Sequence, residues 1–486
     1  MSQDAKVSSP GRHMLAGSLQ LFMAEALIVP TGMVTLAFLT RQLGKGGYGM
    51  FTLAVTVVTW IEWTLVTVTA RAINKSVSET SDWAPVATTA LRLHLILGLV
   101  AMVVVMASAG PVAGLLGDPS LALYFRLLAL DIPLFLLAQG HRNILIGIGR
   151  YRARAWLSAG RWLTRLALLI ICVSVGGGVT GAIVALVGTS LVELILARCF
   201  IRPPMRGASS FPTGKLLAMA WPLFLLGTSL RLFEKVDVFL LKYLGTSNDE
   251  IGLYGAAQNL TILSGIFSLA FTPLLLSTLM RLRRDGEHDR ARAMARDAMR
   301  LGILLLPFAA LMAGAANEIV GLVAGGAFRA AGPLLQALII GSIGMVLISV
   351  GTVVLVANER SWSAAVVGGV TLVLTVSAQW WAIPRWGTQG AATCTAAFQW
   401  VGAVLVAAMM GREGNLLPGV KSMANSFASS GLVYLAATHW NTRGPLVLVK
   451  LAVLAGGVVA AYVVVGELDQ RERNLVRSLV TWTSPT

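Results

Sequence analysis

Long apolar segments recur from one end of this 486-residue chain to the other. Most run for about 18 residues or more, which as a helix is enough to cross the hydrocarbon core of a bilayer. Charged residues make up only 12% of the chain and its mean hydropathy is +0.76, which leaves little room for a soluble domain. The sequence therefore predicts an all-α, polytopic membrane protein.

The distribution of Lys and Arg residues supports the number of spans. We predict about 14 transmembrane helices from the apolar segments. With a cytoplasmic N-terminus, the cytoplasmic segments and their helix ends hold 28 Lys and Arg residues and the external segments hold 7. Because cytoplasmic loops are enriched in these residues, the imbalance predicts that both termini are cytoplasmic. The same bias explains the net charge of +16 without nucleic acid as a partner.

A turn between two predicted helices occurs twice in the chain. The first copy is Thr40–Gly44 followed by Tyr48–Phe51, and the second is Leu241–Gly245 followed by Ile251–Tyr254. Each copy joins two long apolar runs. A duplicated turn between membrane helices indicates two similar bundles, which is typical of transporters.

Further matches extend this duplication across the half-chain. Arg154–Trp156 is followed 206 residues later by the similar Arg360–Trp362. Six predicted spans separate the copies, so both halves have the same orientation. We predict two parallel six-helix lobes, a binding cleft between them, and two further C-terminal helices. The predicted parts are, in order, a cytoplasmic N-terminus at 1–13, an N-lobe at 14–200, a cytoplasmic linker at 201–215, a C-lobe at 216–410, two helices at 411–465 and a cytoplasmic tail at 466–486.

Acidic residues inside the predicted spans are candidates for ion binding, because ionisable groups in lipid are costly and tend to face a cavity or a partner. The N-lobe carries four of them and almost no basic residue in its spans; the four are Glu25, Glu62, Asp131 and Glu193. One interpretation is a site for a coupling cation, either a proton or a sodium ion. The other is that each acid is hydrogen-bonded to a neighbouring helix or kept protonated by burial.

The seventh predicted span is the most polar, with the charged residues Arg231, Glu234, Lys235 and Asp237. Spacings of three and four place the first three on one helix face. These residues either pair with one another or form a cationic site for an anionic head group such as pyrophosphate, which suits guanidinium geometry. Arg41 and Arg126 are further candidates for this head-group site, although interfacial anchoring explains their positions as well.

The sequence shows no signal for a metal site, a cofactor or a catalytic centre. The three cysteines lie far apart, and none of the five histidines has a partner at metal-ligand spacing. The chain lacks a P-loop and the GxSxG and HExxH motifs, and no predicted loop exceeds about 20 residues. We expect a secondary transporter and not an enzyme.

Motifs at several span boundaries match a known pattern. Arg41–Gly44 and Tyr48–Phe51 read Arg-x-Leu-Gly and Tyr-Gly-x-Phe. Asp237–Gly245 and Gly252–Ala257 read Asp-x-x-Leu-Leu-x-x-Leu-Gly and Gly-Leu-Tyr-x-Ala-Ala. These motifs resemble those of the Wzx-type polysaccharide flippases, which are polysaccharide biosynthesis proteins. That family belongs to a superfamily that also holds multidrug and toxic compound extrusion (MATE) proteins and MurJ-type lipid II flippases. The basic residue that often follows the aspartate is Val238 here.

The resemblance implies a MATE-like fold and the translocation of an undecaprenyl-pyrophosphate-linked oligosaccharide across the bacterial inner membrane. Such a flippase serves the synthesis of surface polysaccharide, such as lipopolysaccharide or exopolysaccharide. It works by ion-coupled alternating access among membrane lipids, and polysaccharide polymerase machinery is a further expected partner. Two alternatives stay open. One is a MATE-type multidrug or cation antiporter, and the other is a polytopic glycan polymerase or ligase, which needs larger external loops.

Overall fold

The described part of the chain is helical throughout. The computed structural model describes residues 20–21, 23–80, 82–203, 232–233, 235–411, 418–442 and 444–467, and no β-strand occurs among them. The predicted cytoplasmic N-terminus, most of the linker and most of the C-terminal tail lie outside these residues. The first helices are α2 (Ile28–Glu79), α3 (Ala84–Leu115), α4 (Leu121–Ala129), α5 (Asp131–Gly147), α6 (Tyr151–Cys172), the π-helix η1 (Val173–Gly177) and α7 (Gly178–Phe200).

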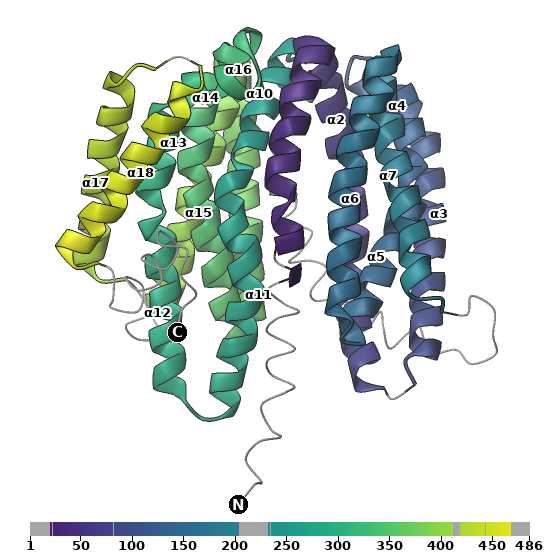
Figure 1. The fold of residues 1–486 in the computed structure, drawn as a ribbon, viewed down its shortest axis with the longest axis horizontal. Helices are drawn as coiled ribbons and strands as arrows, with labels where there is room; N and C mark the ends of the chain where they lie inside the picture. Colours follow the sequence, from purple (N-terminus) through teal and green to yellow (C-terminus); the bar gives the residue numbers. More distant parts are fainter. Residues whose placement is uncertain are drawn as a thin grey trace, which may run out of the picture. The chain divides into compact units, whose positions relative to one another are not determined.

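The later helices follow residue 235 (Figure 1). They are α9 (Val236–Tyr243), α10 (Asn248–Leu260), α11 (Ile262–Arg284), α12 (His288–Leu304), α13 (Leu306–Gly314), α14 (Ala316–Val323), the 3-10 helix η2 (Gly326–Ala331), α15 (Gly332–Ala357), α16 (Ser361–Gly411), α17 (Val420–His439) and α18 (Leu446–Val465). Eight helical segments of the described residues are long and apolar enough to cross a membrane. The predicted all-α, polytopic fold class is therefore confirmed.

Three of these segments are each long enough for two spans. They contain 45, 50 and 51 residues. At about 1.5 Å per residue, each is more than twice as long as the ~30 Å hydrocarbon core. Each is interrupted by a glycine with non-helical backbone angles, at Gly44, Gly176 and Gly387. Each long segment is thus two shorter helices joined at a glycine.

The repeated turn of the sequence has a glycine at positive φ in both copies. Gly44 and Gly245 end the two Leu-Gly turns, with φ angles of 66° and 89°. Positive φ costs other residues about 1–3 kcal/mol, so glycine suits both positions. The repeat-related Trp156 and Trp362 are 71% and 75% exposed, as expected for tryptophans at a membrane interface.

The helices that follow these two turns cross each other closely. A Cβ atom added to Gly49 of α2 would lie 1.9 Å from the carbonyl oxygen of Asn248. A Cβ atom added to Gly252 of α10 would lie 2.2 Å from the carbonyl oxygen of Lys45. Each glycine therefore packs against the carbonyl group four residues before the other glycine, a reciprocal contact between the two copies of the repeat.

A polar contact supports the same turn from the loop between α3 and α4. Asn248 Nδ2 donates to Asp118 Oδ2 at 2.8 Å, and Lys242 Nζ donates to Asn248 Oδ1 at 2.7 Å. Burial alone would raise the pKa of Asp118. The hydrogen bonds from Ser120 and Asn248, together with the charge of Lys242, hold that pKa below its ordinary value.

The chain divides into two compact units. The first comprises residues 1–259, 323–328 and 365–394, and the second comprises 260–322, 329–364 and 395–486. In the first unit α2, α5, α6 and α7 all pack against one another, with α3 against α2 and α5. In the second unit α13 packs between α15 and α17. The lobe boundaries drawn from the sequence stay a prediction.

Buried polar contacts hold the last two helices, α17 and α18, against the rest of the second unit. Lys450 on α18 has no exposed side-chain surface, and its Nζ lies 2.8 Å from Glu318 Oε1 on α14. Glu467, just after α18, accepts hydrogen bonds from Ser422 and Asn425 of α17 at 2.6 and 2.7 Å. The contact between α13 and α17 is extensive as well (Figure 1).

Candidate functional site

Eight ionisable residues of the first unit gather in its interior, and we call them the charged cluster. They are Glu25, Glu62, Asp131, Arg142, Arg154, Arg161, Arg165 and Glu193. They come from five places: the helical residues before α2, α2 itself, α5, α6 and α7. The cluster contains four acids and four arginines, so its formal charges balance.

Helix α6 supplies most of the basic groups. Arg154, Ser158, Arg161 and Arg165 follow one another at spacings of four, three and four residues. This spacing places them along one helical face, which turns toward the acids of neighbouring helices. From the sequence, these arginines are expected in a cytoplasmic segment and at its helix ends. In the structure α6 already begins at Tyr151, so they lie on a helix that can cross the membrane.

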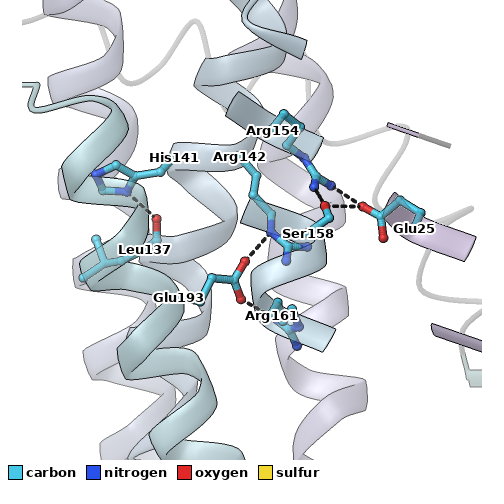
Figure 2. A network of polar contacts seen from close by, with 8 residues as sticks. All are labelled: Glu25, Leu137, His141, Arg142, Arg154, Ser158, Arg161 and Glu193. Carbon is cyan, nitrogen blue, oxygen red and sulfur yellow. Dashed lines mark hydrogen bonds and ion pairs between the residues drawn. The ribbon is translucent and has the colours of Figure 1, made fainter. Parts of the chain in front are cut away.

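Glu193 of α7 lies between two arginines (Figure 2). Arg161 Nη1 donates to its Oε2 at 2.6 Å, and Arg142 Nε pairs with its Oε1. The Glu193 side chain is fully buried, and the Arg142 side chain is 5% exposed. A carboxylate in such a place is stable only because both of its oxygens are paired with cations.

Glu25 forms the second contact with α6. Its Oε1 accepts hydrogen bonds from Arg154 Nη2 and from Ser158 Oγ, both at 2.8 Å (Figure 2). Arg154 Nη1 also donates to Ser158 Oγ. The Glu25 side chain is 26% exposed and that of Arg154 11%. This pair is therefore the part of the charged cluster that solvent or a ligand reaches first.

Glu62 and Asp131 form the acidic part of the cluster. They are 4% and 7% exposed and interact electrostatically with each other. The positive charges of Arg161 and Arg165 act on both. The structure thus brings together all four acidic residues proposed from the sequence. Their role in ion coupling stays a prediction.

The candidates of the seventh span are only partly within the described residues. Arg231 and Glu234 lie outside them. Asp237, at the start of α9, is 1% exposed and accepts hydrogen bonds from Tyr254 Oη at 2.5 Å and from the Val238 backbone at 2.8 Å. Lys235 Nζ donates to Gln258 Oε1 at 3.0 Å.

The two remaining arginine candidates lie at helix ends. Arg41 is exposed and donates to the backbone carbonyls of Ala37 and Val323, both at 2.7 Å. These contacts fix the turn after α14. Arg126 is exposed on the last turn of α4. The head-group role of both residues stays a prediction.

Comparison with known proteins agrees with this architecture. The sequence pattern of the polysaccharide biosynthesis protein family matches residues 14–278, more than half of the chain. The chain belongs to this family. Sequence comparison with curated proteins gives no significant match.

Solved structures of membrane transporters share the fold. The lipid II flippase MurJ in its inward closed conformation matches with a TM-score of 0.74 and 13% identity, covering 95% of this chain and 100% of that chain. An inward-facing MATE family multidrug resistance transporter of the MOP superfamily matches with a TM-score of 0.61 and 14% identity, covering 88% and 99%. A MOP superfamily transporter from Pyrococcus furiosus matches with a TM-score of 0.64 and 15% identity, covering 82% and 95%. The predicted MATE-like polytopic fold is thereby confirmed.

Proposed function

We propose that this family member is a flippase that carries an undecaprenyl-pyrophosphate-linked oligosaccharide across the bacterial inner membrane for surface polysaccharide synthesis. The observation that carries the proposal is the set of four arginines in the interior of the first unit. Arg154 and Arg161 have side chains only 11% and 12% exposed, on a helix that can cross the membrane.

Buried arginines address the main energetic difficulty of this transport. A pyrophosphate group is strongly disfavoured in hydrocarbon, because a charge leaves water without a partner. A guanidinium group offers two parallel donors that match phosphate oxygens, and it keeps its charge when buried. Arginines inside the first unit thus suit an anionic head group better than a cationic drug.

The resting partners of these arginines suggest how the head group is accepted. Four buried guanidinium groups without anions would be unstable, and acids of the charged cluster, Glu193 and Glu25 among them, supply compensating charge. An incoming pyrophosphate replaces a carboxylate at an arginine, and Glu25 at Arg154 is the most exposed pair. The displaced carboxylate is then an unpaired buried charge, which favours uptake of a proton.

The acid pair supplies a place for that proton. Two neighbouring buried carboxylates repel each other when both are ionised, so the pair Glu62 and Asp131 gains from holding one proton. This favours a proton over a sodium ion as the coupling ion. Glu62→Gln and Asp131→Asn should leave flipping insensitive to a proton gradient. Full gradient dependence in both variants would remove this pair from the coupling mechanism.

The head-group role is tested with a variant that keeps the charge. Lysine in place of Arg154 keeps a positive charge that can pair with Glu25. It lacks the two parallel donors with which a guanidinium group binds phosphate oxygens. We expect about a tenfold lower rate of flipping of the pyrophosphate-linked oligosaccharide in reconstituted vesicles. The matched control is Arg290→Lys, since Arg290 is 77% exposed and pairs with Glu287. Equal rates for Arg154→Lys and the control, with both proteins folded, would contradict the proposal.

Further basic residues are candidate ligands of the head group. They are Arg231, Lys235, Arg41 and Arg126, and the same flipping assay on their glutamine variants decides each one.

The charge bias supports cytoplasmic termini. Reporter domains fused to both ends of the chain should therefore be active only on the cytoplasmic side.

A MATE-type cation antiporter is the second candidate. The acidic pair Glu62 and Asp131 favours it, because a cationic substrate needs a carboxylate partner inside the membrane. Efflux of a fluorescent cation by vesicles that do not flip the pyrophosphate-linked oligosaccharide would establish this alternative. The solved structures of similar fold are transporters, and we propose transport without covalent chemistry, in place of polymerase or ligase activity.

A further inference from the structure

A groove on the first unit runs between α5 and α7, apart from the charged cluster. Its volume is about 590 Å³. Apolar side chains form most of its surface, among them Leu137, Leu194 and Ile195. Basic residues close one end, at the last turn of α7, where the groove is lined by Arg198 and Arg202. An apolar channel with a cationic end has the polarity of a phospholipid, with an acyl chain below a phosphate.

The basic residues are available for an anion. Arg202 Nε donates to the Arg198 carbonyl at 3.1 Å, which holds the two residues together at the end of the helix. Neither guanidinium group is paired with a carboxylate in the described part of the chain. Both lie at the end of the helix that the charge bias places at the cytoplasmic leaflet, where basic pockets between helices bind anionic lipid head groups.

A buried histidine also lines the groove. His141 of α5 is 1% exposed, and its Nδ1 donates to the Leu137 carbonyl at 2.8 Å. Its Nε2 is buried without a hydrogen-bond partner. Figure 2 shows His141 and Leu137 on the side of α5 that points away from Arg142 and Glu193. The histidine therefore serves the groove and not the charged cluster.

The position of this imidazole fits a lipid oxygen. His141 lies six residues before the end of α5, and Arg198 lies two residues before the end of α7. His141 is therefore about one helical turn further from the end of its helix than Arg198 is from the end of α7. Because Nδ1 donates to a carbonyl, Nε2 of the neutral ring is an acceptor, which fits a hydroxyl group of a lipid head group.

We propose that the groove between α5 and α7 binds one anionic phospholipid of the cytoplasmic leaflet. Arg198 and Arg202 bind its phosphate, His141 Nε2 accepts from a hydroxyl of its glycerol head group, and an acyl chain lies along Leu137, Leu194 and Ile195. The site is independent of the proposed transport function. Its occupant is a resident lipid that fastens α5 to α7.

This site is tested by adding phosphatidylglycerol or phosphatidylcholine to the purified protein in detergent. Native mass spectrometry measures lipid binding, and thermal unfolding measures stabilisation. We expect a bound phosphatidylglycerol and a raised unfolding temperature, and neither with phosphatidylcholine. The double variant Arg198→Gln/Arg202→Gln should bind phosphatidylglycerol about tenfold more weakly, through loss of two charge-assisted contacts. The matched control, Arg281→Gln/Arg284→Gln, removes two exposed arginines from the last turn of α11 and should bind as the unchanged protein does.

Three results would overturn the proposal. One is equal weakening in the control, which would mean a diffuse attraction of basic surface to anionic lipid. Another is stabilisation by inorganic phosphate alone to the same extent as by phosphatidylglycerol. The third is a His141→Gln protein that folds and binds the lipid with unchanged affinity, since His141 would then have no part in the site.

Discussion

Replacing Gly49 with alanine should force α2 and α10 apart. The new Cβ atom would lie 1.9 Å from the Asn248 carbonyl oxygen and 2.9 Å from the Gly252 nitrogen. Ordinary contact begins at 3.4 Å, so the oxygen is about 1.5 Å too close. Both obstructing atoms belong to the backbone and cannot rotate away. Overpacking costs about 1 to 3 kcal/mol, and we expect the upper end of that range.

Unfolding in detergent micelles, followed by tryptophan fluorescence, measures this cost. The matched control is Gly32→Ala in the same helix, where no atom lies within 4 Å of the added Cβ. Alanine favours helices over glycine by up to about 1 kcal/mol, so the control should be neutral or stabilising. Gly252→Ala should cost as much as Gly49→Ala. The double variant should cost less than the sum, because the first substitution already parts the helices.

A Gly49→Ala protein as stable as the Gly32→Ala protein would refute this reasoning. So would strictly additive costs in the double variant. Additivity would mean that the two glycines do not share one contact, and the reciprocal packing of the repeat copies would then be wrong.

Three further predictions concern stability. Glu193→Gln should lower the free energy of unfolding by about 3 to 5 kcal/mol, because it leaves two guanidinium charges buried without a carboxylate. Adding Arg142→Met should recover part of this loss, and an unchanged free energy of unfolding in Glu193→Gln would contradict the paired geometry. Glu359 has a φ of 63° and is the one non-glycine residue at positive φ in the described chain. Glu359→Gly should therefore raise the free energy of unfolding by about 1 kcal/mol. A lower free energy of unfolding would show that this side chain is needed. Because its pKa is lowered, the stability from Asp118 is fully present above the ordinary value of about 3.9 and is lost as pH falls through the folded value. Asp118→Asn should flatten this acid dependence in thermal unfolding, and an unchanged curve would count against the contact.

The fold could be predicted because its signals lie within single segments. Span length, the bias of Lys and Arg, and the Leu-Gly turns are each visible in a short stretch of sequence. Gly44 and Gly245 both have the positive φ that favours glycine at the end of the repeated turn. The exposed Trp156 and Trp362 likewise match the repeat.

The charged cluster was only half predicted, because its partners are far apart in sequence. Glu25 pairs with Arg154 across 129 residues, and Arg161 pairs with Glu193 across 32. Hydropathy places these arginines outside a span, since each one lowers the local average. Their helical spacing on α6 is the signal that would have placed them on a buried face.

In the second copy of the repeat, two arginines of the charged cluster have uncharged counterparts. Arg154 corresponds to Arg360 at an offset of 206 residues. At the same offset, Arg161 corresponds to Val367 and Arg165 corresponds to Thr371. Val367 is 1% exposed and Thr371 is 2% exposed. The corresponding helix face is therefore just as buried but uncharged. If Arg161 and Arg165 served only to hold the duplicated scaffold together, the second copy would need them as well. The restriction of these two arginines to one copy instead fits a role in substrate or ion binding, while the reciprocal glycine crossing, which both copies share, is the element that the scaffold requires.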